Sequence, residues 1–279
     1  FPYTTLFRSA GILILAPGWS QIPEVGLALA AKAAKINGVY SAMALLDLDT
    51  AKAKKYTDTK SVKEESGYTS PFCYPLWPCD RVGEYILAKS AVAGAMIQYM
   101  ASDNEDVPNQ SPSNHLLGVG GQCLEDGTEV YLDQDQANTV NGYGVTTAIN
   151  QNGYRLWGNY TGAYPASSDA KDIWFAVRRM FSWQGNNFIQ TYFDEVDDPM
   201  NNVLVQSVVD SENIRCSAYA PKYWAGASIE YKSDDNPKTA ILAGTMKFRQ
   251  HIAPYTPAQE IVDIIDYDTD TLAAAVGGN

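Results

Sequence analysis

Short apolar runs alternate with segments of helical periodicity between Gly11 and Ala101, and this alternation limits the possible fold more than any other feature. The run GILILA is uninterrupted by polar residues, as in a strand buried on both faces. Alternating strands and helices favour a mostly parallel sheet with right-handed crossovers. Strands are expected at 11–16, 39–48 and 69–78, and helices at 23–36, 50–56 and 84–101.

Two of these segments carry residues that limit their position. Pro71, Pro75 and Pro78 remove backbone donors from the third strand, which predicts a sheet edge or an irregular strand. The basic stretch around the second helix is expected to be a solvated helix face, with a contact surface for an acidic neighbour as the alternative. Its lysines are Lys52, Lys54, Lys55, Lys60 and Lys63.

The stretch 141–164 contains two Asn-Gly turn dipeptides beside β-branched and aromatic runs. Turn dipeptides in this setting predict two short strands. The stretch has no His, no Cys and no acid, and its one arginine is Arg155. We therefore expect this region to serve packing, and we take Arg155 as a candidate for an interface contact.

The composition changes after residue 164, where helices are expected before two further strands. Asp169 can cap a helix whose apolar residues recur at helical spacing. Arg178 and Arg179 lie on or beside that apolar face and are candidate interface residues. Asp198 can cap a second helix. That helix would run over 199–215, and the strands, joined by a DDNP turn, over 225–233 and 239–254.

The last twenty residues combine apolar and acidic side chains without a compensating base. No Lys or Arg occurs between Gln250 and Asn279, whereas five acids do. A segment this acidic and only partly apolar would bury poorly in its own domain, so we expect an exposed segment that pairs with another chain. Its candidate interface residues are Ile261, Ile264, Ile265, Asp266 and Tyr267.

Composition and motifs argue against several classes of function. The net charge of −12 and the pI near 4.5 disfavour binding to DNA or RNA, which needs clustered Lys and Arg. No apolar run approaches the length of a membrane span. The four cysteines are expected to be reduced thiols, with a disulfide or metal pair as the alternative. GVGG lacks the spacing of a nucleotide-binding loop, and Asp133 and Asp135 suit an acidic turn better than a calcium loop, so no cofactor or metal site is predicted.

The sequence gives no positive sign of catalysis. A serine hydrolase, the alternative from another class, needs a nucleophile, a base and an orienting acid. His115 and His251 are the only histidines, and no Gly-x-Ser-x-Gly elbow occurs. Neither histidine lies in a motif typical of a triad, so no catalytic residue is predicted.

The first nine residues, FPYTTLFRS, look like the in-frame translation of a short-read sequencing adapter. We expect residues 1–9 to be an artefact of sequence-read assembly and the natural sequence to start at about Ala10. A genuine terminal strand is the alternative, because the segment is aromatic and β-branched. On the first interpretation, a natural N-terminal segment of unknown length is absent.

Taken in order, the motifs resemble those of the tail sheath proteins of contractile bacteriophages, from about Gly11 to the C-terminus. GILILAPGWSQIPEV and NGVYSAMALLDLD resemble the early strand-helix-strand of the family's core domain. GVTTAI and GYRLWGNYT resemble its middle signature, with Arg155, Trp157, Gly158 and Thr161 in the matching places. IWFAVRRMF, DDNP and IAPYTPAQEI resemble its later helix and C-terminal domain. The order and spacing of these motifs carry the resemblance, since none is decisive alone.

The resemblance implies an α/β core domain of subtilisin-like shape without a catalytic triad, followed by a smaller α+β C-terminal domain with an extended terminal arm. In the family such arms add a strand to a neighbouring subunit. Tyr154 and Trp157 would be packing anchors where the core ends. The expected bounds are 10–164 for the core, 165–257 for the C-terminal domain and 258–279 for the arm.

The function implied by the resemblance is structural, not enzymatic. A sheath polymerises helically around a tail tube and contracts to drive the tube through the host envelope. The implied partners are further copies of the chain, the tail tube protein, and baseplate and tail terminator proteins, with no direct nucleic-acid contact and no membrane insertion. The implied location is the virion tail, assembled in the bacterial host cytoplasm. The sheath of a tail-derived bacteriocin or of another contractile injection system is the alternative.

Overall fold

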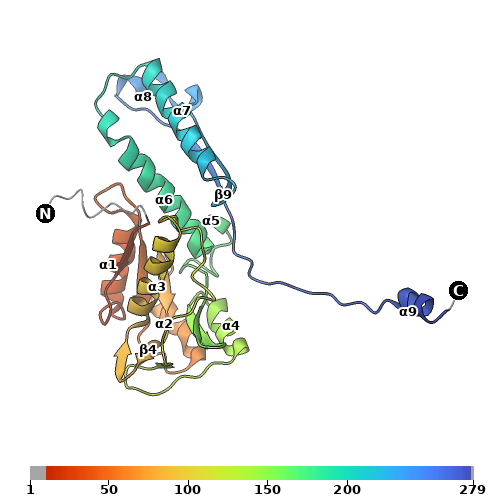
Figure 1. Cartoon of the computed structure of the whole chain (residues 1–279). Coiled ribbons are helices and arrows are strands. Elements are labelled where there is room, and N and C mark those ends of the chain that lie inside the picture. The colour runs from red at the N-terminus through yellow and green to blue at the C-terminus, as the bar shows by residue number, and fades with distance from the viewer. Residues whose placement is uncertain (1–10, 278–279) are drawn as a thin grey trace.

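The computed structural model of the chain describes residues 11–277 (Figure 1). The expectation that residues 1–9 are an adapter artefact lies outside the described residues. The chain runs from a helix-covered sheet, through long helices that extend away from it, into a projecting tail. Within residues 11–277, no helix has both the length and the apolar character needed to cross a membrane.

Parallel strands form the centre of the N-terminal half: β1 (Leu13–Leu15), β2 (Met43–Asp47) and β3 (Cys73–Leu76). They lie in the order β1-β2-β3, which confirms the predicted parallel arrangement. Every residue of β2 and β3 is buried, as expected for strands that are covered on both faces.

Strand β3 is the end strand of this sheet, which confirms the edge position predicted from its prolines, and an isolated bridge adds to its outer side. Leu76 forms a parallel bridge with Thr146, and the Trp77 N–H donates to the Thr146 carbonyl at 2.9 Å. The Thr146 N–H in turn donates to the Pro75 carbonyl at 2.9 Å. A proline fits here because Pro75 takes part in this pairing through its carbonyl oxygen.

Helices cover the two faces of this sheet: α1 (Pro23–Ala34), α2 (Thr59–Ser66), α3 (Lys89–Asp103) and α4 (Gln134–Gly142). Side chains from α1, α2 and α4 share one hydrophobic cluster, and side chains from α3 join another. Strand β2 contributes Ala44 and Leu46 to the first cluster, and Met43 and Leu45 to the second. The alternation of side chains along a buried strand therefore determines which residues meet which helices.

The second predicted helix lies further along the chain than the sequence suggests. In place of a helix at 50–56, the Asp49 carboxylate accepts a hydrogen bond from the Ala51 N–H at 2.8 Å and forms a turn. A 3-10 turn (η2, Tyr56–Asp58) then leads into α2. The short polar side chain of an aspartate competes for backbone donors in this way and favours turns over helix interiors.

The third predicted helix begins later because the residues before it form a hairpin. Strands β4 (Cys79–Val82) and β5 (Tyr85–Leu87) are antiparallel, and β6 (Gly121–Cys123) pairs with the other edge of β4. Gly83, with a φ of 59°, allows the reversal between β4 and β5. Tyr85 is therefore in an exposed strand and not on the helix stripe.

The stretch 141–164 contains one of its two predicted turns. The first Asn-Gly dipeptide ends α4. Asp133 caps that helix by accepting a backbone N–H at 2.8 Å, so the acidic stretch expected to be a turn begins a helix. The second Asn-Gly dipeptide joins the antiparallel strands β7 (Thr147–Asn150) and β8 (Tyr154–Trp157), as predicted.

The C-terminal half consists of long helices and an antiparallel strand pair. Its elements are α5 (Ala170–Ile173), α6 (Phe175–Thr191), η3 (Phe193–Glu195), α7 (Asn202–Ala218), β9 (Trp224–Glu230), η4 (Ser233–Asp235), α8 (Lys238–Leu242) and β10 (Arg249–Pro254). A further hydrophobic cluster includes Met180 of α6, Cys216 of α7 and Trp224 of β9. In Figure 1 the far ends of α6 and α7 lie well away from the N-terminal sheet.

The predicted helix caps in this half are partly confirmed. The Asp169 side chain accepts a backbone N–H at 2.9 Å and begins α5. Trp174 is extended, with a ψ of 121°, and so separates α5 from α6. Helix α7 is capped by Asn201 and not by Asp198. The last predicted strand shortens to β10, because residues 238–242 form α8.

Beyond β10 the chain leaves the body as a tail. The Tyr255 hydroxyl donates to the Pro221 carbonyl at 3.0 Å, and Asn159 Nδ2 donates to Gln259 Oε1 at 2.7 Å. These two contacts hold the start of the tail against the body. The remainder projects away from it in Figure 1 and ends in α9 (Thr269–Ala275).

Candidate assembly surfaces

The tail from residue 258 to residue 277, which we call the terminal arm, exposes apolar side chains along its length. Contiguous exposed apolar surface in a soluble protein marks an interaction site. All the arm residues proposed from the sequence are exposed: Ile261 to 89%, Ile264 to 79%, Ile265 to 87%, Tyr267 to 76%, and Asp266. The structure therefore places these five residues together on one unburied segment.

The backbone of the arm forms no regular secondary structure between residues 259 and 268, and α9 begins at Thr269. The segment expected to be a strand is thus not paired within its own chain. An unpaired segment with apolar residues and free backbone groups can add as a strand to the sheet edge of another chain. An unpaired strand of this kind is marginal alone and gains its stability on pairing.

The paired arginines of α6 are held within the chain. Arg178 forms an ion pair with Asp172 at 3.1 Å, and its guanidinium lies 4.3 Å from the centre of the Phe72 ring. Arg179 is buried and donates to the Gly11 carbonyl at 3.3 Å. Burial lowers the pKa of Arg179 to about 10. Their contribution to a contact between subunits stays a prediction.

Arg155 holds a loop against strand β8. Its Nε donates to the Gln151 carbonyl at 3.1 Å, and its Nη1 donates to the Asn114 carbonyl at 2.8 Å. Beside it, Leu116 forms an antiparallel bridge with Arg155. The contacts seen for Arg155 are therefore intramolecular, and its role at an interface also stays a prediction.

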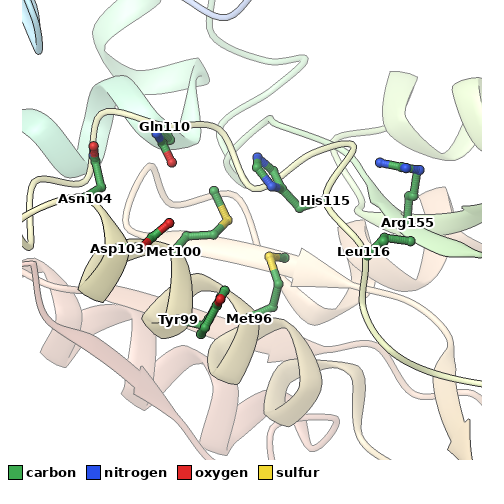
Figure 2. A pocket seen from close by; sticks show the side chains of 9 residues that line it. All are labelled: Met96, Tyr99, Met100, Asp103, Asn104, Gln110, His115, Leu116 and Arg155. Atoms are coloured by element: carbon green, nitrogen blue, oxygen red, sulfur yellow. The ribbon is translucent and has the colours of Figure 1, made fainter.

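A cavity of about 350 Å³ lies between this loop and α3. Figure 2 shows Met96, Tyr99 and Met100 on α3, with His115 and Arg155 on the facing segments. Burial, followed by the charge of Arg155, lowers the pKa of His115 below its usual range. Within residues 11–277, neither this imidazole nor that of His251, which contacts Glu230, is hydrogen-bonded to a serine or cysteine.

One lysine of the basic stretch was misjudged from the sequence. Lys63 was expected on a solvated helix face, yet it is buried. Its Nζ donates to the Tyr143 carbonyl at 2.9 Å and to the Tyr164 carbonyl at 2.5 Å. Lys63 therefore joins α2 to both ends of the segment that carries β7 and β8. Burial lowers the pKa of Lys63 to about 8.

Replacing Lys63 should remove a pH dependence of stability. The folded chain releases the Lys63 proton near pH 8, whereas the unfolded chain keeps it to its ordinary pKa of 10.5. The unfolded state then binds more protons, so stability should rise between these two pH values by roughly 3 kcal/mol relative to the Lys63→Met variant. Urea unfolding of both proteins at pH 7.5 and 10.5 measures this difference. The exposed Lys60 on the same helix provides the control, Lys60→Met, and parallel pH profiles for all three proteins would contradict the assignment.

No protein-family model matches the sequence. The major tail sheath protein of Serratia phage KSP20 is 27% identical over 197 residues, which cover 67% of this chain and 48% of that protein. The tail sheath protein of Burkholderia phage BcepMu is 28% identical over 180 residues, which cover 61% of this chain and 36% of that protein. The chain is therefore similar in sequence to phage tail sheath proteins. The chain spans about half the length, or less, of these curated relatives.

Solved structures from contractile assemblies share the fold of this chain. A chain of the anti-feeding prophage baseplate has a TM-score of 0.72 at 19% identity, covering 92% of this chain and 69% of that one. A chain of the PVC sheath complex, an extracellular contractile injection system in its contracted state, has a TM-score of 0.74 at 17% identity, covering 93% and 71%. At these identities the likeness establishes a common mixed α/β fold.

Proposed function

We propose that the chain is a structural subunit of a contractile tail sheath, which polymerises helically around a tail tube and contracts to drive that tube through the host envelope. The relationship to phage tail sheath proteins carries this proposal. The exposed terminal arm supports it, because a segment that its own chain does not bury is available to a neighbouring copy.

The proposal includes the way in which subunits are joined and what surrounds them. Each arm adds a strand to the next subunit, and contacts whose rotation does not close generate a helical filament. Exchanged strands keep subunits tethered while they rotate during contraction, so the energy comes from changed interfaces and no nucleotide is required. The remaining partners are the tail tube, baseplate and tail terminator proteins, and the site of action is the virion tail after assembly in the host cytoplasm.

A division into domains follows from the same proposal. Residues 10–164 form the α/β core of subtilisin-like shape, residues 165–257 form the α+β C-terminal domain, and residues 258–279 form the arm. Because the proposed role is structural, we expect no hydrolase activity from the core, which would need a nucleophile, a base and an orienting acid. A fluorophosphonate serine probe that left both His115→Ala and the unaltered chain unlabelled would support this assignment, whereas labelling that His115→Ala abolishes would favour a hydrolase.

A sheath of a non-viral injection system is the second candidate. The fold similarity to a chain of an extracellular contractile injection system supports this second candidate. Both candidate functions assign the same mechanical role to the chain. The identities of the genes beside its own gene would distinguish a phage tail from an injection system.

Self-association is the first test of the proposed function. Sedimentation velocity over a range of concentrations should reveal oligomers that grow with concentration, because open helical assembly has no fixed size. A sedimentation coefficient that stays at the value of the monomer at every concentration would contradict the proposal.

A further inference from the structure

Strands β4 and β6 place two cysteines opposite each other. Cys79 is the first residue of β4 and Cys123 is the last residue of β6, and the two are partners in the antiparallel register. Both are free thiols. Of the other two cysteines, Cys73 lies opposite Ala44 in the parallel sheet and Cys216 lies in α7. The fold therefore brings together one pair of thiols that lie far apart in the sequence.

The backbone hydrogen bonds around β6 define the type of this pair. On the side of β6 that faces away from β4, the Val130 N–H donates to the Gln122 carbonyl at 2.9 Å. Backbone groups of successive residues point in opposite directions along a strand, so those of Cys123 point toward β4. Cys79 and Cys123 are therefore a hydrogen-bonded antiparallel pair, in which the Cα atoms lie about 5.5 Å apart.

This separation suits a disulfide bond. The Cα atoms of bonded cysteines are usually about 4.4–6.8 Å apart, and the side chains of opposed residues lie on the same face of a sheet. Electrostatics also places the two thiols near each other, because burial, followed by the charges of Asp47 and Cys123, raises the pKa of Cys79 to about 12. The bond can thus form without a rearrangement of the backbone.

The two thiols differ in their access to a reagent. Cys79 is half-buried and lines a cavity of about 300 Å³ beside the end of β2. Exposed residues, among them Gly18 and Glu125, border this cavity, so it is continuous with the surface. Cys123, by contrast, is fully buried. A small disulfide reagent should therefore react first at Cys79, and Cys123 can then displace it.

A bond between these cysteines would join the two ends of the segment that contains α3. This helix covers one face of the parallel sheet and carries Lys89, whose ammonium is paired with Asp80 of β4. A cross-link between distant residues stabilises a fold mainly by restricting the unfolded chain, and more so when it closes a long segment. The bond would therefore fasten α3 and its ion pair to the sheet.

We propose that Cys79 and Cys123 are a redox-controlled modification site, free in a reducing medium and joined as a disulfide in an oxidising one. The pair is set by the fold alone and does not depend on the proposed function. Under that function the bond has a use, since a chain assembled in a reducing cytoplasm and then released from the cell would gain it outside.

The oxidation proceeds by exchange with a disulfide such as oxidised glutathione. The Cys79 thiolate attacks one sulfur of glutathione disulfide, which forms a mixed disulfide and releases one glutathione thiolate. The Cys123 thiolate then attacks the Cys79 sulfur and releases the second glutathione. The two protein thiols give up two electrons and two protons, and glutathione disulfide takes up both and becomes two thiols. The raised pKa of Cys79 leaves little thiolate near neutral pH, so the exchange is slow.

Mapping of the bond by mass spectrometry tests the proposal. The reduced full chain is kept with excess oxidised glutathione, both as the folded protein and during refolding from urea, and its remaining thiols are alkylated before digestion. A peptide pair linked through Cys79 and Cys123 is expected, with Cys73 and Cys216 alkylated. Absence of that pair from both samples, or a bond that uses Cys73 or Cys216 in the folded protein, would overturn the proposal.

Single serine variants test the order in which the two thiols react. Cys123→Ser should stop at the mixed disulfide and retain glutathione on Cys79, whereas Cys79→Ser should stay unmodified because Cys123 is buried. The reverse pattern would show that Cys123 is the accessible thiol and would overturn this mechanism.

Thermal unfolding tests whether the bond fastens the fold. The oxidised chain should unfold at a temperature about 5 °C higher than the reduced chain. The double variant Cys79→Ser, Cys123→Ser is the control and should unfold at the same temperature in both buffers. Equal unfolding temperatures for the oxidised and reduced full chain would contradict the stabilising role. Sedimentation velocity measures self-association separately, so failure of this inference would leave the proposed function standing.

Discussion

Removal of residues 260–279 is expected to abolish assembly and leave a folded monomer. Among residues 11–277, those that contribute to the hydrophobic clusters precede residue 255, and residues 260–277 are exposed. The deletion therefore takes away surface that the isolated chain does not bury, and its thermal unfolding should match that of the full chain. Sedimentation velocity should detect one species at the monomer value at concentrations where the full chain associates.

Two variants that keep the full chain length test whether assembly needs the apolar side chains of the arm or only the presence of the segment. The triple change Ile261→Ser, Ile264→Ser, Ile265→Ser should reproduce the deletion, because paired strands need apolar contacts as well as backbone bonds. The double change Leu272→Ser, Val276→Ser alters exposed residues at α9, beyond the segment assigned to pairing, and should still assemble. Normal assembly of the deleted chain would show that the arm is not what joins subunits.

Loss of the buried lysine of α3 should cost more stability than the other single changes considered. The Lys89 ammonium forms an ion pair with the Asp80 carboxylate, and both side chains are fully buried. Replacing Lys89 by methionine leaves a buried carboxylate without its counter-charge, which costs about 3–5 kcal/mol. Burial already raises the pKa of Asp80, so the variant should regain stability as the pH falls and the carboxyl group takes up a proton. Urea unfolding as a function of pH measures both effects.

The double variant Asp80→Leu, Lys89→Met provides the decisive comparison. Replacing both partners removes the unpaired charge, so most of the lost stability should return. The exposed pair of Lys222 and Glu105 is the control, and Lys222→Met should change stability little. A Lys89→Met variant as stable as the unaltered chain would mean that water or another group reaches Asp80.

Elements with a strong local signal could be predicted from the sequence. The apolar run around β1, the N-terminal proline of α1 at Pro23 and the cap at Asp169 each specify an element through neighbouring residues alone. The parallel order of β1, β2 and β3 also follows from alternation with helices. These features depend on short-range chemistry, which the sequence shows directly.

Elements that depend on distant contacts could not be predicted. Strand β5 consists of exposed residues and exists because it pairs with β4. Lys63 resembles its solvated lysine neighbours in the sequence, and only the approach of two carbonyl groups, 80 and 101 residues away, reveals its buried role. Tertiary context overrides local propensity in such cases.

Among the candidate assembly surfaces, too, some features could be predicted from the sequence and others could not. The arm was found from composition, because a run of acids and isoleucines without bases is visible in the sequence. The closure of the β9 edge was not, because it depends on the position of α7 and on the two hydrogen bonds that Asn213 makes to Ile229. An asparagine within a helix gives no signal of that role.

Electron microscopy of the complete gene product tests whether this chain is a sheath subunit. Helical polymerisation around a tube predicts hollow, striated tubes with a regular axial repeat. The deletion of residues 260–279 provides the matched negative sample. Hollow striated tubes that vanish with the deletion are expected, and a complete gene product that remains dispersed as monomers would contradict the proposed sheath function.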